Sequence, residues 1–111
     1  MKQNLIIVQT SVSEISVANT IAAMLIESHL AACVKIIPGV TSFYMWHDRL
    51  NSESEYIMQF KTIADKFEAV KAAILKVHPY DVPEIISTPV DQIHNEYYDW
   101  VIKATSTDVV E

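Results

Sequence analysis

The side chains best suited to chemistry in this sequence are its four histidines and its single cysteine. They are His29, Cys33, His47, His78 and His94. Imidazole and thiolate groups bind zinc and copper, but no C-x-x-C or H-x-x-x-H spacing links these residues. His29 and Cys33 are four residues apart, yet the helix that would align them is expected to end between them. Cys33 stands in an apolar stretch, where we expect a small buried side chain with an unreactive thiol.

His78 opens the segment HPYDVPEIISTPV (78–90), which holds three of the four prolines. A residue before proline is pushed out of helical geometry, so a helix should end at His78. The histidine then either caps that helix, where the dipole favours its charged form, or contacts a metal. The prolines also restrict the turn. They fix the directions of Tyr80 and Glu84, either as a rigid connection or as the wall of a binding cleft.

Three further aromatic side chains and one lysine are candidates for the same cleft. Tyr44, Trp46 and Trp100 could line it, with Lys61 as its cation, because aromatic walls with a few polar groups are typical of small-ligand sites. Subunit interfaces use the same residue types, so a ligand cleft and an interface both remain open.

Catalysis finds little support in the residue pattern. A single glycine excludes the glycine-rich loops that hold phosphates and dinucleotides, and His47-Asp48 has no recognisable nucleophile motif beside it. Glu53 and Glu55 alternate along one strand face, which we interpret as a solvated polar surface. We therefore predict no enzyme activity, no catalytic residues and no organic cofactor.

Composition limits the class of protein further. The chain has 111 residues, half of them hydrophobic, and a net charge of −6, which favours one domain spanning 1–111. Its eight basic residues are scattered, which argues against nucleic acid and against an anionic membrane surface. A lone cysteine, no signal-peptide pattern and no apolar stretch of about 20 residues predict a cytoplasmic protein outside the membrane.

Hydrophobic periodicity predicts an α+β fold with the order strand, helix, strand, strand, helix, strand and a short closing element. The expected strands are 4–10, 31–46, 55–62 and 84–90, the helices 11–29 and 64–77, and the closing helix or strand 94–103. Ser11 and Glu14 form the S-x-x-E capping pattern at the first helix. This order is the ferredoxin-like split βαβ arrangement, with both helices on one face of an antiparallel sheet.

The second and third strands should form a long protruding hairpin, with a break at Pro38-Gly39 and a polar turn at 48–54. Its aromatic residues are Phe43, Tyr44, Trp46, Tyr56 and Phe60. Exposed aromatic residues on a ribbon with unpaired edges favour association. We therefore predict a closed homo-oligomer.

Several segments resemble the CutA divalent-cation tolerance proteins over most of the chain. The resemblance is carried by LAACVKIIPGVTSFYMW, the pair Lys61-Thr62, HPYDVPEIISTPV and YYDW. It implies a ferredoxin-like fold, similar in shape to the PII signalling proteins, assembled as a homotrimer. It also implies a link to copper or other divalent cations, with no reaction attached.

This chain lacks part of a metal-ligand set found in some members of the family that it resembles. Some bacterial members with a proposed copper site carry Cys directly before Thr10 and two consecutive histidines in the H-P-Y motif. This chain has Gln9, and Val77 before His78. Only His78 of that set is present, so it is the metal ligand that the sequence predicts. Two functions follow: a homotrimer that binds divalent cations weakly in metal tolerance, or a PII-like module that binds a small ligand or partner at an inter-subunit cleft.

Overall fold

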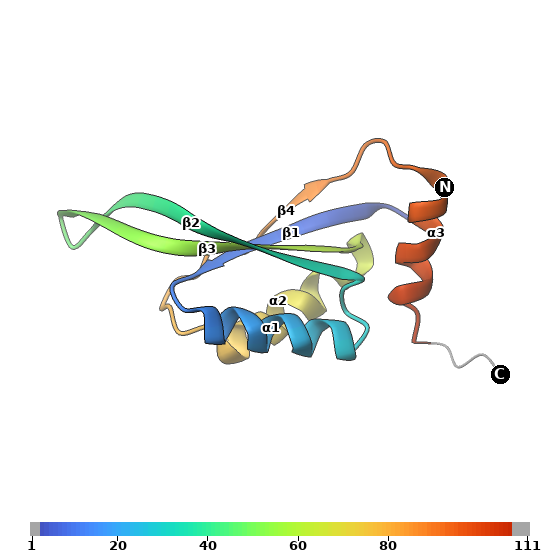
Figure 1. Cartoon of the computed structure of the whole chain (residues 1–111), viewed down its shortest axis with the longest axis horizontal. Helices are drawn as coiled ribbons and strands as arrows, with labels where there is room; N and C mark the ends of the chain where they lie inside the picture. The colour runs from blue at the N-terminus through green and yellow to red at the C-terminus, as the bar shows by residue number, and fades with distance from the viewer. Residues whose placement is uncertain (1–2, 108–111) are drawn as a thin grey trace.

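The computed structural model describes residues 3–107, which fold into a four-stranded antiparallel sheet with helices (Figure 1). In chain order the elements are β1 (Leu5–Val12), α1 (Ile15–Glu27), β2 (Cys33–Trp46), β3 (Arg49–Ile63), the 3₁₀ turn η1 (Ala64–Lys66), α2 (Phe67–Val77), β4 (Ile86–Pro89) and α3 (Asn95–Ala104). The strand order is β2-β3-β1-β4. Helices α1 and α2 cover one face of the sheet, and α3 lies at the end opposite the hairpin. The predicted ferredoxin-like α+β fold is confirmed.

Strand alternation places the core between the sheet and helices α1 and α2. Alternate residues of β1 and β3 enter one apolar cluster with the inner stripes of both helices. Phe60 on β3, Ile21 and Leu25 on α1 and Ile74 on α2 are fully buried there. Each such side chain contributes about 1.5–3 kcal/mol by leaving water. This layer fixes the sheet on which the candidate site is built.

The first helix begins later than its sequence pattern predicts. Ser11 still belongs to β1, and Glu14 is the N-cap, in extended geometry with no side-chain capping hydrogen bond. The predicted capping box of Ser11 and Glu14 is therefore wrong. Ser11 pairs with Ile57 of β3, so the sheet ladder takes the residue that the local pattern assigned to the helix start.

The β2–β3 hairpin extends well beyond the rest of the sheet and makes the molecule elongated, 53 × 27 × 22 Å. The pairing shifts register between Ile37 and Val40, where Gly39 has a φ of +74°, so the predicted break at Pro38-Gly39 is confirmed. Glycine adopts such a backbone at no steric cost because it has no Cβ. The irregularity lets the outer part of the hairpin turn relative to the sheet.

The hairpin turn is shorter than expected. His47 and Asp48, with φ of 52° and 61°, join the strands, and pairing resumes at Arg49 opposite Trp46. Positive φ at both central residues is the mark of the tight two-residue hairpin turn. The predicted polar turn at 48–54 is therefore wrong, because most of its polar residues continue β3.

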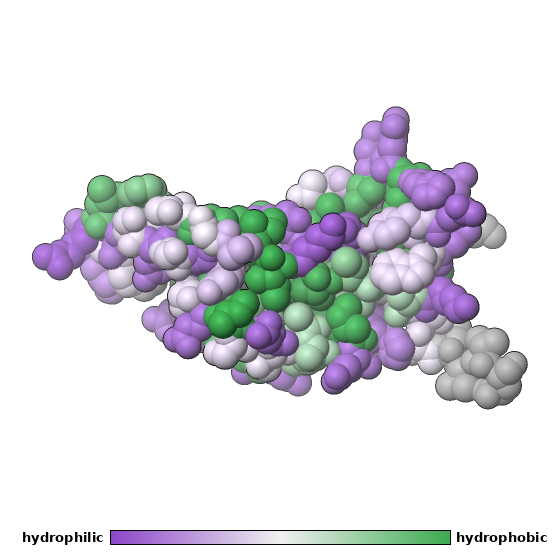
Figure 2. Space-filling view, viewed as in Figure 1, coloured by the Kyte–Doolittle hydropathy of each residue, from purple (hydrophilic) through white to green (hydrophobic). Residues whose placement is uncertain are grey.

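The predicted row of exposed hairpin aromatics is only partly correct. Phe60 is fully buried and Tyr56 packs against the core. Phe43 remains exposed on the outer arm together with Met45 and Leu50. Figure 2 shows hydrophobic side chains on this arm, away from the body of the molecule.

The closing element, left open between helix and strand, is the helix α3. Its Val101 is fully buried with Leu5 and Ala32 in a second small apolar cluster. None of the helices within residues 3–107 is long and apolar enough to cross a membrane.

Candidate ligand cleft

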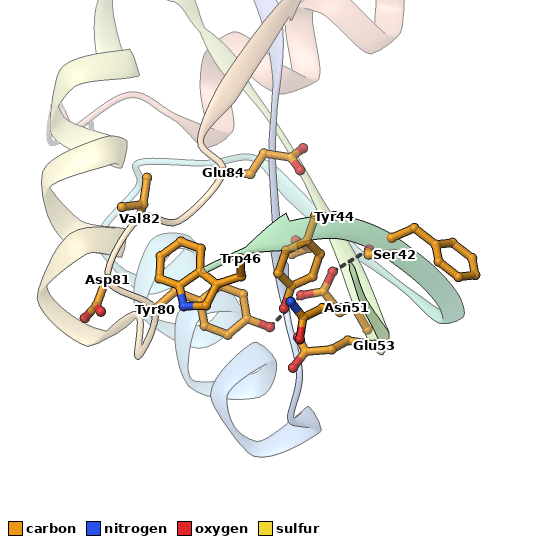
Figure 3. A pocket seen from close by; sticks show the side chains of 12 residues that line it. Ser42, Tyr44, Trp46, Asn51, Glu53, Tyr80, Asp81, Val82 and Glu84 are labelled. Atoms are coloured by element: carbon orange, nitrogen blue, oxygen red, sulfur yellow. Dashed lines mark hydrogen bonds between the residues drawn. The ribbon is translucent and has the colours of Figure 1, made fainter. Parts of the chain in front are cut away.

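A cleft of about 700 Å³ lies between the outer hairpin and the segment that joins α2 to β4 (Figure 3). This volume falls within the range of small-molecule sites, about 300–1,000 Å³. The residues that line it on the hairpin and on the joining segment are Ser42, Phe43, Tyr44, Trp46, Asn51, Glu53, Glu55, Tyr80, Asp81, Val82 and Glu84, with Ser11 at the end of β1.

Cross-strand pairing explains why the hairpin presents a polar wall. Ser42 pairs with Glu53 and Tyr44 pairs with Asn51, so these four side chains share one face of the ribbon. Alternation places Glu55 on the same face. It is only 6 % exposed, so the interpretation of Glu55 as part of a solvated surface is wrong.

Glu55 joins the two walls of the cleft. The Ser42 hydroxyl donates to its Oε1 at 2.6 Å, and the Tyr80 hydroxyl donates to its Oε2 at 2.5 Å. Hydrogen bonds to a carboxylate are short and about twice as strong as neutral ones. The bond from Tyr80 holds the joining segment against the hairpin, and the bond from Ser42 fixes the Glu55 side chain within the hairpin.

His78 supports the wall that is formed by the segment between α2 and β4. It follows α2 in extended geometry, as its place before proline requires. Its Nε2–H donates to the Ser11 carbonyl oxygen at 2.9 Å, and its Nδ1 accepts the Tyr80 backbone N–H at 3.2 Å. Carbonyls only accept and amides only donate, so the proton resides on Nε2. Both ring nitrogens are occupied, which leaves neither free to bind a metal.

The cleft is strongly acidic. Glu53, Glu55, Asp81 and Glu84 all line it, and no lysine or arginine does so among the described residues. The Glu84 carboxylate also accepts from the Gln9 amide at 2.9 Å. A cavity with this lining focuses a negative potential that attracts cations.

The same carboxylates keep two tyrosines protonated. Burial, together with the hydrogen bond to Glu55, raises the pKa of Tyr80 to about 12. The hydrogen bond to Glu53 raises the pKa of Tyr44 above its ordinary value. Both phenols are donors to carboxylates at neutral pH, and the raised pKa extends that role into the alkaline range.

Alkaline unfolding provides a test of the Tyr80–Glu55 bond. Because the folded-state pKa of Tyr80 exceeds the unfolded value of 10.0, its contribution is complete below pH 10 and is lost as pH rises toward 12. Tyr80 is partly exposed, so we expect about 1 kcal/mol, less than the full shift would give. Urea unfolding at several alkaline pH values should show a shallower loss of stability in Tyr80→Phe than in the native chain. Equal slopes would contradict the bond.

Within one chain the predicted cleft residues fall into two groups. Tyr44, Trp46, Tyr80 and Glu84 line the cleft. Lys61 and Trp100 are absent from its lining and belong to a cluster around Tyr97 of α3.

In that second cluster Tyr97 is the shared partner of the lysine and the tryptophan. The Lys61 Nζ lies 5.7 Å from the centre of the Tyr97 ring, and Trp100 stacks on Tyr97 with ring centres 5.6 Å apart. A cation over an aromatic face stabilises this packing.

The other predicted metal-ligand candidates are dispersed. His29 donates from Nδ1 to the Ala104 carbonyl at 3.2 Å, His47 lies in the hairpin turn, and His94 precedes α3. Across residues 3–107, no three side chains of His, Cys, Asp or Glu converge as metal ligands.

Comparison with known proteins identifies the family. Residues 6–104 match the family described as CutA1 divalent ion tolerance protein. The chain belongs to the CutA1 family. It is 39 % identical to the divalent-cation tolerance protein CutA of Thermus thermophilus, over 89 % of this chain and 96 % of that protein. It is 42 % identical to the CutA homolog of Xenopus laevis, over 78 % of this chain and 57 % of that longer protein.

Solved CutA1 structures share the fold closely. The protein from Oryza sativa has a TM-score of 0.91 at 29 % identity, covering 96 % of this chain and 97 % of that one. The Thermus thermophilus protein has a TM-score of 0.88 at 38 % identity, covering 92 % and 99 %. The CutA protein of Archaeoglobus fulgidus, with a TM-score of 0.89 at 29 % identity over 92 % and 99 % of the two chains, is named as periplasmic.

Proposed function

We propose that this CutA1-family chain acts as a homotrimer that binds cations in divalent-cation tolerance and catalyses no reaction. The observation that carries the proposal is that, among residues 3–107, nothing covers either edge of the sheet or the face opposite α1 and α2. β2 and β4 are the edge strands, and their Ile37 and Ile86 are 41 % and 50 % exposed. Register places both isoleucines on the face opposite α1 and α2.

Two unlike open edges suit a closed ring of identical chains. In a head-to-tail contact, the β2 edge of one chain meets the β4 edge of the next, and a rotation that closes after three copies leaves no edge free. Such a ring buries Ile37 and Ile86.

The copper-type ligand set does not fit this chain. His78 has both nitrogens engaged. Gln9, which stands at the cysteine position, is held between Glu84 and Gln59 through hydrogen bonds of 2.9 and 3.2 Å. Copper or another divalent cation is therefore expected to bind weakly, through the carboxylates of the cleft, and not through His78.

Calorimetric titration with Cu(II) and Zn(II) tests this assignment. We expect dissociation constants weaker than about 0.1 mM, equivalent to less than about 5.5 kcal/mol of binding. His78→Gln, which retains a donor for the Ser11 carbonyl, should leave them unchanged, and Glu53→Gln should weaken them. Micromolar binding that His78→Gln removes would establish a His78 site and contradict the proposal.

The proposal of a non-enzymatic role is supported by the state of the reactive groups. Tyr80, with a pKa of about 12, is a poor proton-transfer group at neutral pH. It donates to Glu55 in a contact that joins two segments. We also propose a cytoplasmic location, supported by the single cysteine, which suits a reducing compartment.

A second candidate function is favoured by the cleft itself. Its volume of about 700 Å³ and its aromatic walls exceed what a bare ion needs. They suit a PII-like module that binds a small ligand.

A further inference from the structure

The charge of Glu55 has no counter-charge within the described residues. Its carboxylate is 6 % exposed, and both oxygens accept hydrogen bonds from neutral hydroxyl groups. Between residues 3 and 107 the ion pairs are Lys71–Glu68 and His94–Glu96, both outside the cleft. Buried carboxylates are almost always paired with a cation. The hydroxyls satisfy the oxygens of Glu55 but leave its negative charge at the cleft uncompensated.

The remaining carboxylates are divided between the two walls. Glu53 lies beside Glu55 on the hairpin, whereas Asp81 and Glu84 belong to the opposite segment (Figure 3). No three of them converge as metal ligands in the described part of the chain. The cleft therefore presents negative charge on both walls, at Glu53 and Glu55 on the hairpin and at Glu84 on the joining segment, a pattern that one small ion cannot neutralise.

The space between these centres is bordered by aromatic and aliphatic side chains. Trp46, Tyr44 and Tyr80 project toward the cleft in Figure 3, and Val82 lies on the joining segment. Aromatic faces attract alkylammonium groups, and methylene groups pack against such walls with loss of water. A hydrated inorganic cation gains little from either contact.

We propose that the cleft binds an aliphatic diamine or polyamine. One ammonium group lies at Glu53 and Glu55, a second lies at Glu84, and the methylene chain between them packs against the aromatic walls. This inference rests on the second candidate function, a small-ligand module, and names its class of ligand.

Titration with spermidine and 1,4-diaminobutane tests the inference, with n-butylamine and tetramethylammonium as singly charged controls. The chain has two tryptophans, so a Trp100→Phe background makes Trp46 the only fluorescent indole, and calorimetry gives the stoichiometry. We expect saturable binding of one diamine per chain, at least about ten-fold tighter than n-butylamine, the effect of about 1.4 kcal/mol from a second ion pair. The signal of Trp46 should change on binding.

Matched variants locate the bound amine. Glu53→Gln and Glu84→Gln should each weaken spermidine binding about ten-fold, whereas Glu27→Gln, the same change at an exposed position at the end of α1, should not. Absence of saturation, equal affinity for n-butylamine, or equal losses in all three variants would overturn the inference. Light scattering on the same samples separates the amine site from the proposed homotrimer. A trimer that binds no amine would overturn the amine site and leave the homotrimer standing.

Discussion

Ile37→Glu and Ile86→Glu are each expected to convert the proposed trimer to a monomer. Both isoleucines are about half exposed in the single chain, 41 % and 50 %, so a charge there disturbs the folded chain little. In the proposed ring they are buried between chains, where an unpaired carboxylate costs about 3–5 kcal/mol at each contact. That cost weakens association by more than about a hundred-fold. Size-exclusion chromatography with light scattering should report the mass of one chain.

Leu75→Glu provides the matched control for this experiment. Leu75 is 51 % exposed but lies on α2, in the helical layer that covers the other face of the sheet. The same change there should preserve the trimer. If all three variants kept the native mass, the edges and the open face would not be the interface. If Leu75→Glu alone dissociated the protein, the helical layer would be the interface instead.

His78→Ala is expected to lower the free energy of unfolding by about 2–3 kcal/mol. The substitution leaves the Ser11 carbonyl without its donor and the Tyr80 N–H without its acceptor, at a residue 9 % exposed. Each buried group left unsatisfied costs about 1–3 kcal/mol. It also removes an edge-on ring contact with Tyr80, whose centre is 4.7 Å away. Urea unfolding at one fixed protein concentration measures the change.

Two further variants define the cause of that loss. His78→Gln offers an amide donor to the Ser11 carbonyl and should recover part of the stability. His94→Ala, at an exposed histidine before α3, should change stability by less than about 0.5 kcal/mol. A loss below about 0.5 kcal/mol in His78→Ala would show that these hydrogen bonds do not support the cleft wall.

Local patterns were sufficient to predict the fold. Alternation in β1, the helical stripes of α1 and α2, and Pro38-Gly39 each encode geometry within a few residues. The misplaced boundaries have one common cause. Ser11 carries a capping pattern and residues 48–54 carry turn-like composition, but both segments pair with neighbouring strands. Strand pairing, with the distant Ile57 for Ser11 and across the hairpin for residues 49–54, overrode the local preference at both places.

The site was only partly predictable for the same reason. The proline-restricted turn and the hairpin aromatics indicated where Tyr80, Trp46 and Tyr44 would lie. The burial of Glu55 depends on Tyr80, which lies 25 residues further along the chain, and on Ser42 of the neighbouring strand. The polarity of the residues next to Glu55 in the sequence reveals neither contact. The one available signal was the shared face of Ser42, Glu53 and Glu55. It becomes visible once the two-residue turn fixes the hairpin register.

The mass of the native protein in solution tests the central claim most directly. The proposed ring covers the open sheet edges and buries the exposed isoleucines only if the chains associate. Light scattering over a range of about 1–100 µM chain concentration is the measurement, since an assembly responds to concentration. A mass three times that of one chain, unchanged across the range, is the result that the homotrimer predicts. The mass of a single chain throughout would contradict it.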